Sequence, residues 1–452
     1  MWNSEDENRA LSAAVETLRA GFADLPGTLD LEADGFAALS DVLREAAARL
    51  VDNYPYFHPL YAGQMLMPPH PVARLAYSLA MTLNPNNHAL DGGRASSAME
   101  KEAVAQIAAM FGWETHLGHL CGGGTMANLE ALWIARQLAA RPERGHSAIA
   151  ASAQAHYTHS RLSGVLGVPF VSIPCDRLGR MDAAALEARL KTRDIGTVVA
   201  TMGTTATGAV DPLPRLLELR DRYGFRLHAD AAYGGYFTLA DNLAPEARAA
   251  FDHIGEADSI VIDPHKHGLQ PYGCGCILFR DPTVGRIYKH DSPYTYFSST
   301  ELHLGEISLE CSRAGASAVA LWATQRLLPL VRGGEMAVGL QRSREAAIEF
   351  HRRLRSDDRF LTAFEPELDI VVWLPRAASV SEASRRSQQI FDEAARSNLH
   401  LALAELPTDF FDLAGLEIDR PTALCLRSVL MKPDHLDWLD EIWRLLTAAQ
   451  QI

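Results

Sequence analysis

The stretch that decides the fold is Ser259-Ile260-Val261-Ile262-Asp263-Pro264-His265-Lys266-His267-Gly268. Its apolar run does not alternate with polar residues, so it predicts a strand over 259–262 that is covered on both faces. Lys266 follows this strand closely, and ligands of open α/β sheets lie at the carboxyl ends of strands. A lysine held there is partly desolvated and is a candidate Schiff-base nucleophile. The alternative for a lysine taken alone is an ordinary solvated surface side chain.

An acidic residue ends the apolar strand that comes before this one along the chain. In Leu227-His228-Ala229-Asp230-Ala231-Ala232-Tyr233-Gly234-Gly235, small residues follow Asp230. A carboxylate at a strand end could pair with a cationic ring nitrogen of a ligand; a helix cap or a loop carboxylate is the alternative. The separation from Lys266, 266 − 230 = 36 residues, fits two neighbouring strand ends joined by one crossover.

A third segment, Cys121-Gly122-Gly123-Gly124-Thr125-Met126-Ala127-Asn128, places three glycines before a predicted helix over 125–138. Glycine lets the backbone approach a ligand closely, and the free N–H groups at a helix start favour phosphate. The segment is neither G-x-x-x-x-G-K-[ST] nor G-x-G-x-x-G, so it does not support a nucleotide site. The alternative is a tight turn with Thr125 as the helix cap.

Short apolar runs alternate with amphipathic stretches around these segments, which predicts an open α/β sheet with mostly parallel strands. Residues 1–50 have helical spacing, and the proline-rich stretch 52–71 suits an extended arm. We therefore divide the chain into an arm (1–70), a large α/β domain (71–330) and a smaller α+β domain (331–452). The predicted strands are 147–151, 170–173, 197–202, 226–229, 259–262, 276–279, 370–374, 400–404 and 423–428; further predicted helices are 182–190, 213–223, 335–354, 380–397 and 434–449.

The composition limits the classes of partner. The 452 residues include 42 Lys+Arg and 56 Asp+Glu, so the formal net charge is 42 − 56 = −14, which argues against a general nucleic-acid or anionic-membrane binder. Six cysteines lie scattered with no C-x-x-C pair, which argues against a disulfide framework or structural zinc. With no apolar run of about 18 residues and no signal-peptide pattern, we expect a soluble cytoplasmic protein.

Four motifs occur together and in one order: Gly-Gly-Thr-x-Ala-Asn-Leu-x-Ala-Leu from Gly123, Gly-Thr-Thr from Gly203, His-x-Asp-Ala-Ala-Tyr-Gly-Gly from His228, and Asp-Pro-His-Lys from Asp263. In these motifs the chain resembles the group II amino-acid decarboxylases, which use pyridoxal phosphate (PLP) and have the aspartate-aminotransferase fold, fold type I. The resemblance extends over about 54–430, and 263–281 is most similar to the short tyrosine/aspartate decarboxylase branch. It implies a mostly parallel central sheet flanked by helices, a smaller α+β C-terminal domain, and decarboxylation of an L-amino acid to its amine and CO2.

The resemblance also implies roles for the motif residues. Lys266 would form the internal aldimine with the cofactor, and Asp230 would keep the pyridinium nitrogen protonated. Gly124 and Thr125 would bind the phosphate, with His265 nearby.

Other matching positions surround the cofactor ring. By resemblance, His156 would stack on one ring face and Ala232 would pack on the other. Thr205 would lie beside cofactor and substrate, with Thr204 as the second choice. A mobile-loop tyrosine would protonate Cα, and we prefer Tyr296 to Tyr294.

Some positions depart from the family pattern or stay open. Asp263 and His267 stand where relatives often have Asn and Trp; an anionic Asp263 would disfavour phosphate unless it is turned away or paired. Three arginines are candidate ligands of a substrate carboxylate or, alternatively, structural ion pairs: Arg94, Arg313 and Arg427. The substrate side chain stays open.

Several readings compete with amino-acid decarboxylation. The same fold could support a decarboxylative oxidase or aldehyde synthase, or a Cα–Cβ lyase. More remote alternatives are a non-catalytic partner protein and a metal-dependent hydrolase, since His116-x-x-His119, His156-x-x-His159 and His265-x-His267 could be ligand pairs. We favour no metal. Enzymes of this resemblance are homodimers with the site at the interface, and the arm would suit such contacts.

Overall fold

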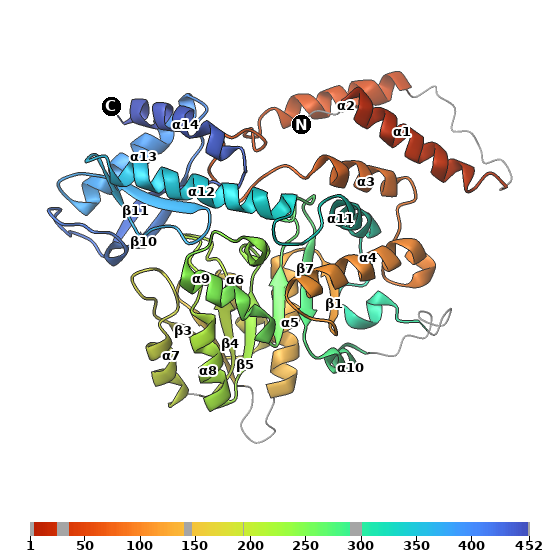
Figure 1. Ribbon diagram of the computed structural model, residues 1–452, viewed down its shortest axis with the longest axis horizontal. Coiled ribbons are helices and arrows are strands. Elements are labelled where there is room, and N and C mark those ends of the chain that lie inside the picture. The colour runs from red at the N-terminus through yellow and green to blue at the C-terminus, as the bar shows by residue number, and fades with distance from the viewer. Residues whose placement is uncertain (1–3, 25–35, 140–146, 193, 290–300, 451–452) are drawn as a thin grey trace.

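A seven-stranded sheet with the order β1-β7-β6-β5-β4-β2-β3 forms the centre of the computed structural model (Figure 1). The structure describes residues 4–24, 36–139, 147–192, 194–289 and 301–450. The four pairings among β2 to β6 are parallel, whereas β7 pairs antiparallel with both β6 and β1. The strands are β1 (Leu117–Cys121), β2 (Ala148–Ser152), β3 (Phe170–Ile173), β4 (Ile195–Thr201), β5 (Arg226–Asp230), β6 (Ser259–Ile262) and β7 (Gly275–Phe279).

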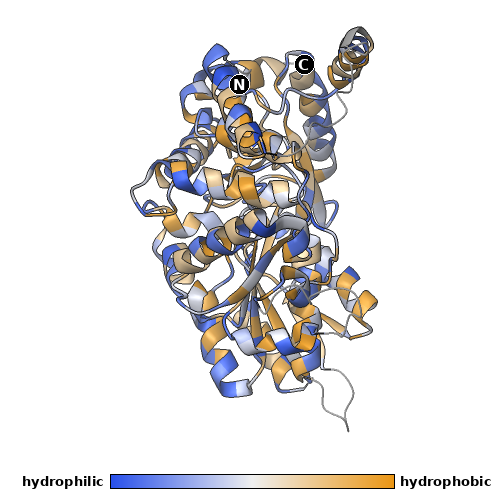
Figure 2. Ribbon diagram, turned by 90° about the vertical axis from the view of Figure 1, so that its right-hand side faces the viewer, coloured by the Kyte–Doolittle hydropathy of each residue, from blue (hydrophilic) through white to orange (hydrophobic). Residues whose placement is uncertain are grey.

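Both faces of this sheet are buried, as the continuous apolar run over 259–262 predicts. Ile260 and Ile262 pack in the cluster that contains Leu216 of α8 (Leu213–Tyr223). Val261, between them, packs with Ala131 and neighbouring residues of α5 (Gly124–Ala139). Successive strand residues point to opposite faces, so helices cover both sides. Hydrophobic residues accordingly gather on the central strands (Figure 2).

The described residues also form a set of α-helices. They are α1 (Glu5–Ala20), α2 (Phe36–Leu50), α3 (Pro71–Met81), α4 (Leu90–Met110), α5 (Gly124–Ala139), α6 (Thr158–Leu166), α7 (Ala183–Leu190), α8 (Leu213–Tyr223), α9 (Pro245–Asp252), α10 (Gly285–Tyr288), α11 (Gly315–Leu327), α12 (Glu335–Arg355), α13 (Val380–Arg396) and α14 (His435–Ala449). No helix in the described ranges is long and apolar enough to cross a membrane.

A second, four-stranded sheet follows in the C-terminal part, with the order β10-β11-β9-β8 and only antiparallel pairs. Its strands are β8 (Phe360–Thr362), β9 (Ile370–Pro375), β10 (Ala402–Pro407) and β11 (Thr422–Val429). Helices α12, α13 and α14 pack on it around the fully buried Trp373. The α/β class with a mostly parallel central sheet and a separate smaller sheet is thus confirmed.

Candidate active site

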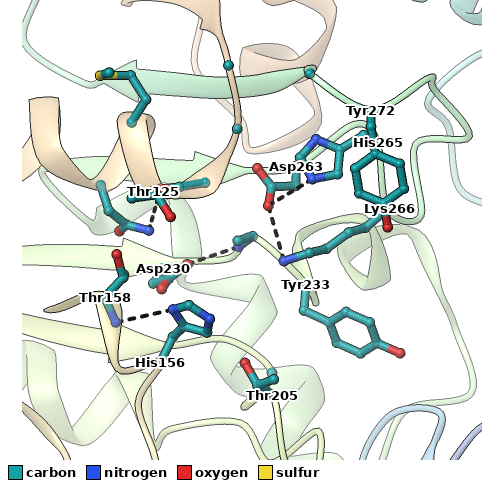
Figure 3. Close-up of a pocket in the computed structure, with 18 of the residues that line it drawn as sticks. Thr125, His156, Thr158, Thr205, Asp230, Tyr233, Asp263, His265, Lys266 and Tyr272 are labelled. Atoms are coloured by element: carbon teal, nitrogen blue, oxygen red, sulfur yellow. Dashed lines mark hydrogen bonds and ion pairs between the residues drawn. The ribbon is translucent and has the colours of Figure 1, made fainter. Parts of the chain in front are cut away.

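A cavity of about 540 Å³ opens where β4, β5 and β6 end and α5 begins (Figure 3). Residues from these strand ends, from the turn before α5 and from the start of α6 face into it. The structure brings eight of the predicted site residues into its lining: Gly124, Thr125, His156, Thr205, Asp230, Ala232, His265 and Lys266.

Lys266 is paired with a carboxylate in this cavity. Its Nζ lies 3.1 Å from Oδ2 of Asp263, and Nε2 of His265 lies 3.6 Å from the same oxygen. Asp263 is buried, and its Oδ1 has no hydrogen-bond partner among the described residues. The acidic side chain that departs from the family pattern therefore faces the cavity and is paired, rather than turned away.

The turn before α5 leaves room for a bound anion but none for side chains. Gly123 has φ +142°, a backbone conformation that favours glycine. A Cβ on Gly124 would lie 2.8 Å from Asp263 Oδ2, and one on Gly275 would lie 2.5 Å from Gly123 Cα. The first N–H groups of α5 have no partners inside the helix. They face a cavity that the ring of His265 also lines, so the turn fits a phosphate group.

A chain of neutral hydrogen bonds ties this turn to the neighbouring strands. Asn128 Nδ2 donates to the carbonyl oxygen of Gly124 at 2.8 Å, and its Oδ1 accepts from Nε2 of His228 at 2.8 Å. Nδ1 of His228 lies 2.9 Å from the hydroxyl of Ser259. Burial lowers the pKa of His228 to about 3, so this imidazole is neutral at pH 7. The turn is thereby fixed relative to β5 and β6.

Asp230 lies buried at the end of β5 and accepts two hydrogen bonds. His159 Nε2 donates to Oδ2 at 2.8 Å, and the N–H of Ala232 donates to Oδ1 at 3.2 Å. Burial by itself would raise the pKa of Asp230, but the His159 hydrogen bond and the nearby Lys266 hold this pKa below the ordinary aspartate value. The carboxylate is therefore anionic and suits a protonated ring nitrogen.

His156 reaches the cavity from the turn before α6. Its Nδ1 accepts the backbone N–H of Thr158 at 3.3 Å, and its ring lies 4.3 Å from that of Tyr157, between centroids. Burial lowers the pKa of His156 from its ordinary value, so the ring is neutral at pH 7. A neutral, half-buried imidazole at the cavity wall suits stacking on an aromatic ligand.

A family model described as the pyridoxal-dependent decarboxylase conserved domain matches residues 40–374. The chain belongs to this family. It is an enzyme family that uses PLP, and the cavity described above offers what that cofactor needs: a lysine, a buried anionic carboxylate and a glycine turn at a helix start.

Some relatives of this decarboxylase are named as tyrosine decarboxylases and others as aspartate decarboxylases. The chain is 29% identical to the L-tyrosine decarboxylase of Enterococcus faecium over 78% of its own length and 75% of that protein. It is 31% identical to the L-aspartate decarboxylase of Thermococcus kodakarensis, over 64% and 72%. It is 30% identical to the L-tyrosine decarboxylase of Levilactobacillus brevis, of which it spans only 57%.

Solved structures show the same fold at low identity. The crystal structure of Oryza sativa TDC with PLP and tryptamine has a TM-score of 0.79 and 19% identity, covering 100% of this chain and 99% of that chain. The structure of Rhodiola rosea 4-hydroxyphenylacetaldehyde synthase has a TM-score of 0.76 and 18% identity, covering 99% and 97%.

The histidine pairs that suggest metal ligands are used differently in this decarboxylase. The second histidine of each pair bonds a buried carboxylate: His119 to Glu130 at 2.9 Å, His159 to Asp230 at 2.8 Å, and His267 to Asp369 at 2.8 Å. Across the described ranges, no group of three or more His, Cys, Asp or Glu side chains is arranged to hold a metal ion.

The three candidate arginines differ in position, and none of them is among the residues that line the cavity. Arg94 is exposed. Arg313 forms a buried ion pair with Glu100 at 2.9 Å and bonds the carbonyl of Leu120, which is the structural alternative. Arg427 lies directly behind the cavity wall, where it donates to the carbonyl oxygen of Thr205 at 2.7 Å.

His267, whose direction the sequence leaves open, points away from the cavity. Its Nε2 bonds Oδ2 of Asp369, and its Nδ1 lies 3.0 Å from the carbonyl oxygen of Tyr233. The Tyr233 hydroxyl donates to Oδ1 of the same Asp369 at 2.6 Å. Asp369 therefore joins the segment just before β9 to two turns: the lysine-bearing turn through His267, and the turn after β5 through Tyr233.

The sequence does not single out three residues around the site. His159 holds Asp230; Glu310 accepts the N–H of Gly122 at 2.9 Å; and the Tyr272 ring lies 4.8 Å from that of His265, between centroids. Glu310 and Tyr272 line the cavity. Only the spacing of His159 from His156 carried a signal, and it suggested a metal pair. Tyr294 and Tyr296 lie outside the described residues.

Proposed function

We propose that this protein removes the α-carboxylate of an L-amino acid as CO2 and releases the amine, with PLP held by Lys266 in the described cavity. One observation carries the proposal: a lysine, an anionic buried aspartate and a glycine turn at a helix start face the same cavity. The names of the relatives support tyrosine or aspartate as the first substrates to assay.

The residues present fit the cofactor. Gly124 and Thr125 would hold the phosphate, with His265 beside it, and Asp230 would hold a proton on the ring nitrogen. When bound, PLP supplies a ring that takes up the electron pair left by departing CO2. His156 and Ala232 are the residues we place against the two ring faces.

The substrate contacts are inferred from the cavity wall. Thr205 faces the cavity, and the buried guanidinium of Arg427 donates to its carbonyl oxygen and to that of Ala206. The same guanidinium donates to the carbonyl oxygen of Gly63 and to Oε1 of Gln64, so its described hydrogen-bond partners include no carboxylate. We place a substrate carboxylate near Thr205 and Arg427, because a guanidinium matches a carboxylate in shape and charge. Arg94 and Arg313 rank lower, since one is exposed and the other is already paired.

The outcome of the reaction depends on where the proton goes after CO2 leaves. We assign the protonation of Cα to Tyr296, with Tyr294 as the second choice. If oxygen reacts at this stage instead, the product is an aldehyde, and a Cα–Cβ lyase would release no CO2. Assays of CO2, amine, aldehyde and peroxide across a panel of amino acids separate these reactions; absence of CO2 with every amino acid would reject decarboxylation.

The decisive experiment uses the lysine and the aspartate. Borohydride should bleach the visible absorption of the protein as purified, and Lys266→Ala should lose turnover while retaining some cofactor. Asp230→Ala should weaken both turnover and cofactor binding. Full activity in Lys266→Ala would refute the assignment, and a colourless, zinc-loaded protein would favour the metal-dependent alternative.

We further propose that the enzyme is a cytoplasmic homodimer whose sites lie at the subunit interface. The support is the N-terminal part of the chain: α1 has no buried residue, and α2 exposes Leu39, Val42, Leu43 and Leu50. Both helices lie at the edge of the molecule, away from the two sheets (Figure 1). An apolar helix face of this kind needs a covering partner.

A further inference from the structure

We infer that His159 is a positioning residue: its imidazole fixes the Asp230 carboxylate and keeps it anionic for the ring nitrogen of the cofactor. The inference rests on the proposed function, because it concerns the carboxylate to which we assign the ring nitrogen. His159 itself is absent from the cavity lining and acts through Asp230.

Among the described residues, the side chain of His159 makes one polar contact, with the carboxylate of Asp230. The residue is 0% exposed, and its Nε2 lies 2.8 Å from Asp230 Oδ2. An ionised carboxylate can only accept, so Nε2 must carry the hydrogen. The other ring nitrogen, Nδ1, is buried without a hydrogen-bond partner among the described residues. The imidazole therefore serves as a single N–H donor to the carboxylate.

The histidine at the cavity wall lies just before the helix that carries His159. The backbone N–H of His159 donates to the carbonyl oxygen of His156 at 3.1 Å, and the Ser163 hydroxyl donates to the carbonyl oxygen of His159 at 2.9 Å. The first of these bonds links the turn before α6, which carries His156 at the cavity, to the first turn of α6, which carries His159 behind Asp230. The ring face and the ring nitrogen of a bound cofactor would be held from one short segment.

The electrostatic need for this donor follows from the surroundings of Asp230. The carboxylate is buried, and among the described residues its other oxygen, Oδ1, accepts only the N–H of Ala232, at 3.2 Å. The groups that face it are His156 and His159 from the start of α6, His228 from its own strand, and Lys266 and Asp263 from the turn after β6. Without His159, the pKa of Asp230 should rise, because burial raises it and Lys266 would be left to oppose that rise.

The test compares His159→Leu, which removes the donor, with His159→Gln, which keeps a side-chain N–H. Apo protein is titrated with PLP by fluorescence, and the visible absorption of the loaded protein is followed across pH. By analogy with outer-shell partners of metal ligands, we expect His159→Leu to weaken PLP binding about 10- to 100-fold. It should also shift the pH profile of the absorption, and His159→Gln should recover most of both.

A second buried pair in the same chain supplies the control. His119 of β1 is also buried and bonds Glu130 at 2.9 Å, but neither residue lines the cavity. His119→Leu should lower the thermal stability without moving the pH profile of the absorption. The inference is overturned if His159→Leu binds PLP and titrates like the parent, or if His119→Leu shifts the profile equally.

Two further measurements keep the result interpretable. If His159→Leu does not fold, His159→Phe, which keeps a ring but has no donor, replaces it, and an unchanged pH profile in that folded variant contradicts the inference. In an Asp230→Asn background, His159→Leu should weaken PLP binding little further, because the two residues act as one unit. The proposed function is judged separately on the parent: a parent that forms no amine, or has no borohydride-sensitive absorption, fails before any His159 variant is made.

Discussion

The Asp263 carboxylate lies beside the turn where we place the cofactor phosphate. Its Oδ2 would be 2.8 Å from a Cβ on Gly124 and lies 3.1 Å from Lys266 Nζ. Asp263→Asn removes a negative charge near a second anion and releases the lysine. We expect the apo variant to bind PLP roughly fivefold more tightly, the factor given by about 1 kcal/mol. Titration of apo protein with PLP measures this change.

A matched variant separates this local effect from net charge. Asp221→Asn makes the same charge change at a side chain that is 72% exposed and absent from the cavity lining, so its PLP affinity should equal that of the parent. Unchanged or weaker binding by Asp263→Asn would mean that the pair with Lys266 matters more than the repulsion of the phosphate.

Site residues were predictable where a reactive side chain follows a strand that the sequence predicts. Asp230 ends β5 and Lys266 follows β6, and these two parallel strands are neighbours, so their carboxyl ends bring the two side chains to one edge of the sheet. His159 was not predictable, because its partner Asp230 is 71 residues away and only the packing of α6 joins them. The direction of His267 likewise depends on Asp369, 102 residues later.

At the scale of elements, β7 and the turn before α5 touch backbone to backbone. A Cβ on Gly275 would meet three backbone atoms of Gly123 at 2.5 to 2.9 Å, which no rotamer change can relieve. We expect Gly275→Ala to displace the turn and weaken PLP binding at least about tenfold, with a lower melting temperature, because a shift of the N–H groups costs more than 1.4 kcal/mol. PLP titration and thermal unfolding test this.

The control for this substitution is a glycine with free space around it. Nothing lies within 4 Å of a Cβ on Gly164, which is inside α6. Gly164→Ala should therefore keep the parent's affinity for PLP and raise stability slightly, by up to about 1 kcal/mol from helix propensity. Parent-like PLP binding by Gly275→Ala would show that the turn does not need its contact with β7.

Strands that contain a short apolar run were predictable, and strands without one were not. The predicted strands over 170–173 and 259–262 agree with β3 and β6 residue by residue. In contrast, β1 contains Gly118 and His119 and has no β-branched residue, and its partner β7 lies far along the chain. The short β8 depends likewise on its pairing with β9. Both strands depend on pairing with another segment of the chain, and no local sequence pattern predicts that pairing.

A buried lysine ties the N-terminal arm to the small sheet and should make stability depend on pH. Lys432 is 4% exposed, and its Nζ donates to the Tyr61 carbonyl oxygen at 2.7 Å. Burial lowers the pKa of Lys432 to about 7, whereas an unfolded lysine titrates near ~10.4. Between these values the unfolded chain binds the extra proton, so this group makes the folded state more stable as pH rises.

Replacement by an apolar side chain of similar length removes this dependence. Lys432→Met should therefore gain most over the parent below pH 7, and its advantage should shrink as pH rises toward about 10. Urea unfolding at pH 6, 7.5 and 9 measures the difference in the free energy of unfolding. A difference that stays constant across these pH values would show that the lysine keeps its proton when folded.

At the scale of the whole molecule, side chains and backbone join the two sheets at the cavity. The Arg427 guanidinium bonds the Thr205 carbonyl from the small sheet, and the Asp369 carboxylate holds both His267 and Tyr233 of the large one. Both contacts of Asp369 are buried, and the bond of Arg427 to Thr205 is partly buried. Motion of the small sheet would thus be transmitted to Thr205 and to the turn that carries Lys266.

The N-terminal helix α1 has no buried residue and pairs with α3 through Glu7 and Arg74 at 3.7 Å, and α2 exposes apolar side chains; both features support the dimer. Leu39, Val42 and Leu43 of α2 are 53%, 62% and 59% exposed, at spacings that place them on one helix face. Leu43→Glu introduces a charge into this face, so we expect the dimer to dissociate into monomers at micromolar concentration. Because we place the sites at the interface, PLP affinity and turnover should fall with it.

Sedimentation velocity, read together with a PLP titration, tests this expectation. Glu45→Gln is the matched control, because Glu45 lies on the same helix, its side chain is 68% exposed, and it pairs with Arg49 of that helix. Its sedimentation should equal that of the parent. A parent that sediments as a monomer would reject the dimer. A Leu43→Glu variant that stays dimeric would instead place the interface elsewhere, while a monomer with full turnover would show that each chain completes its own site.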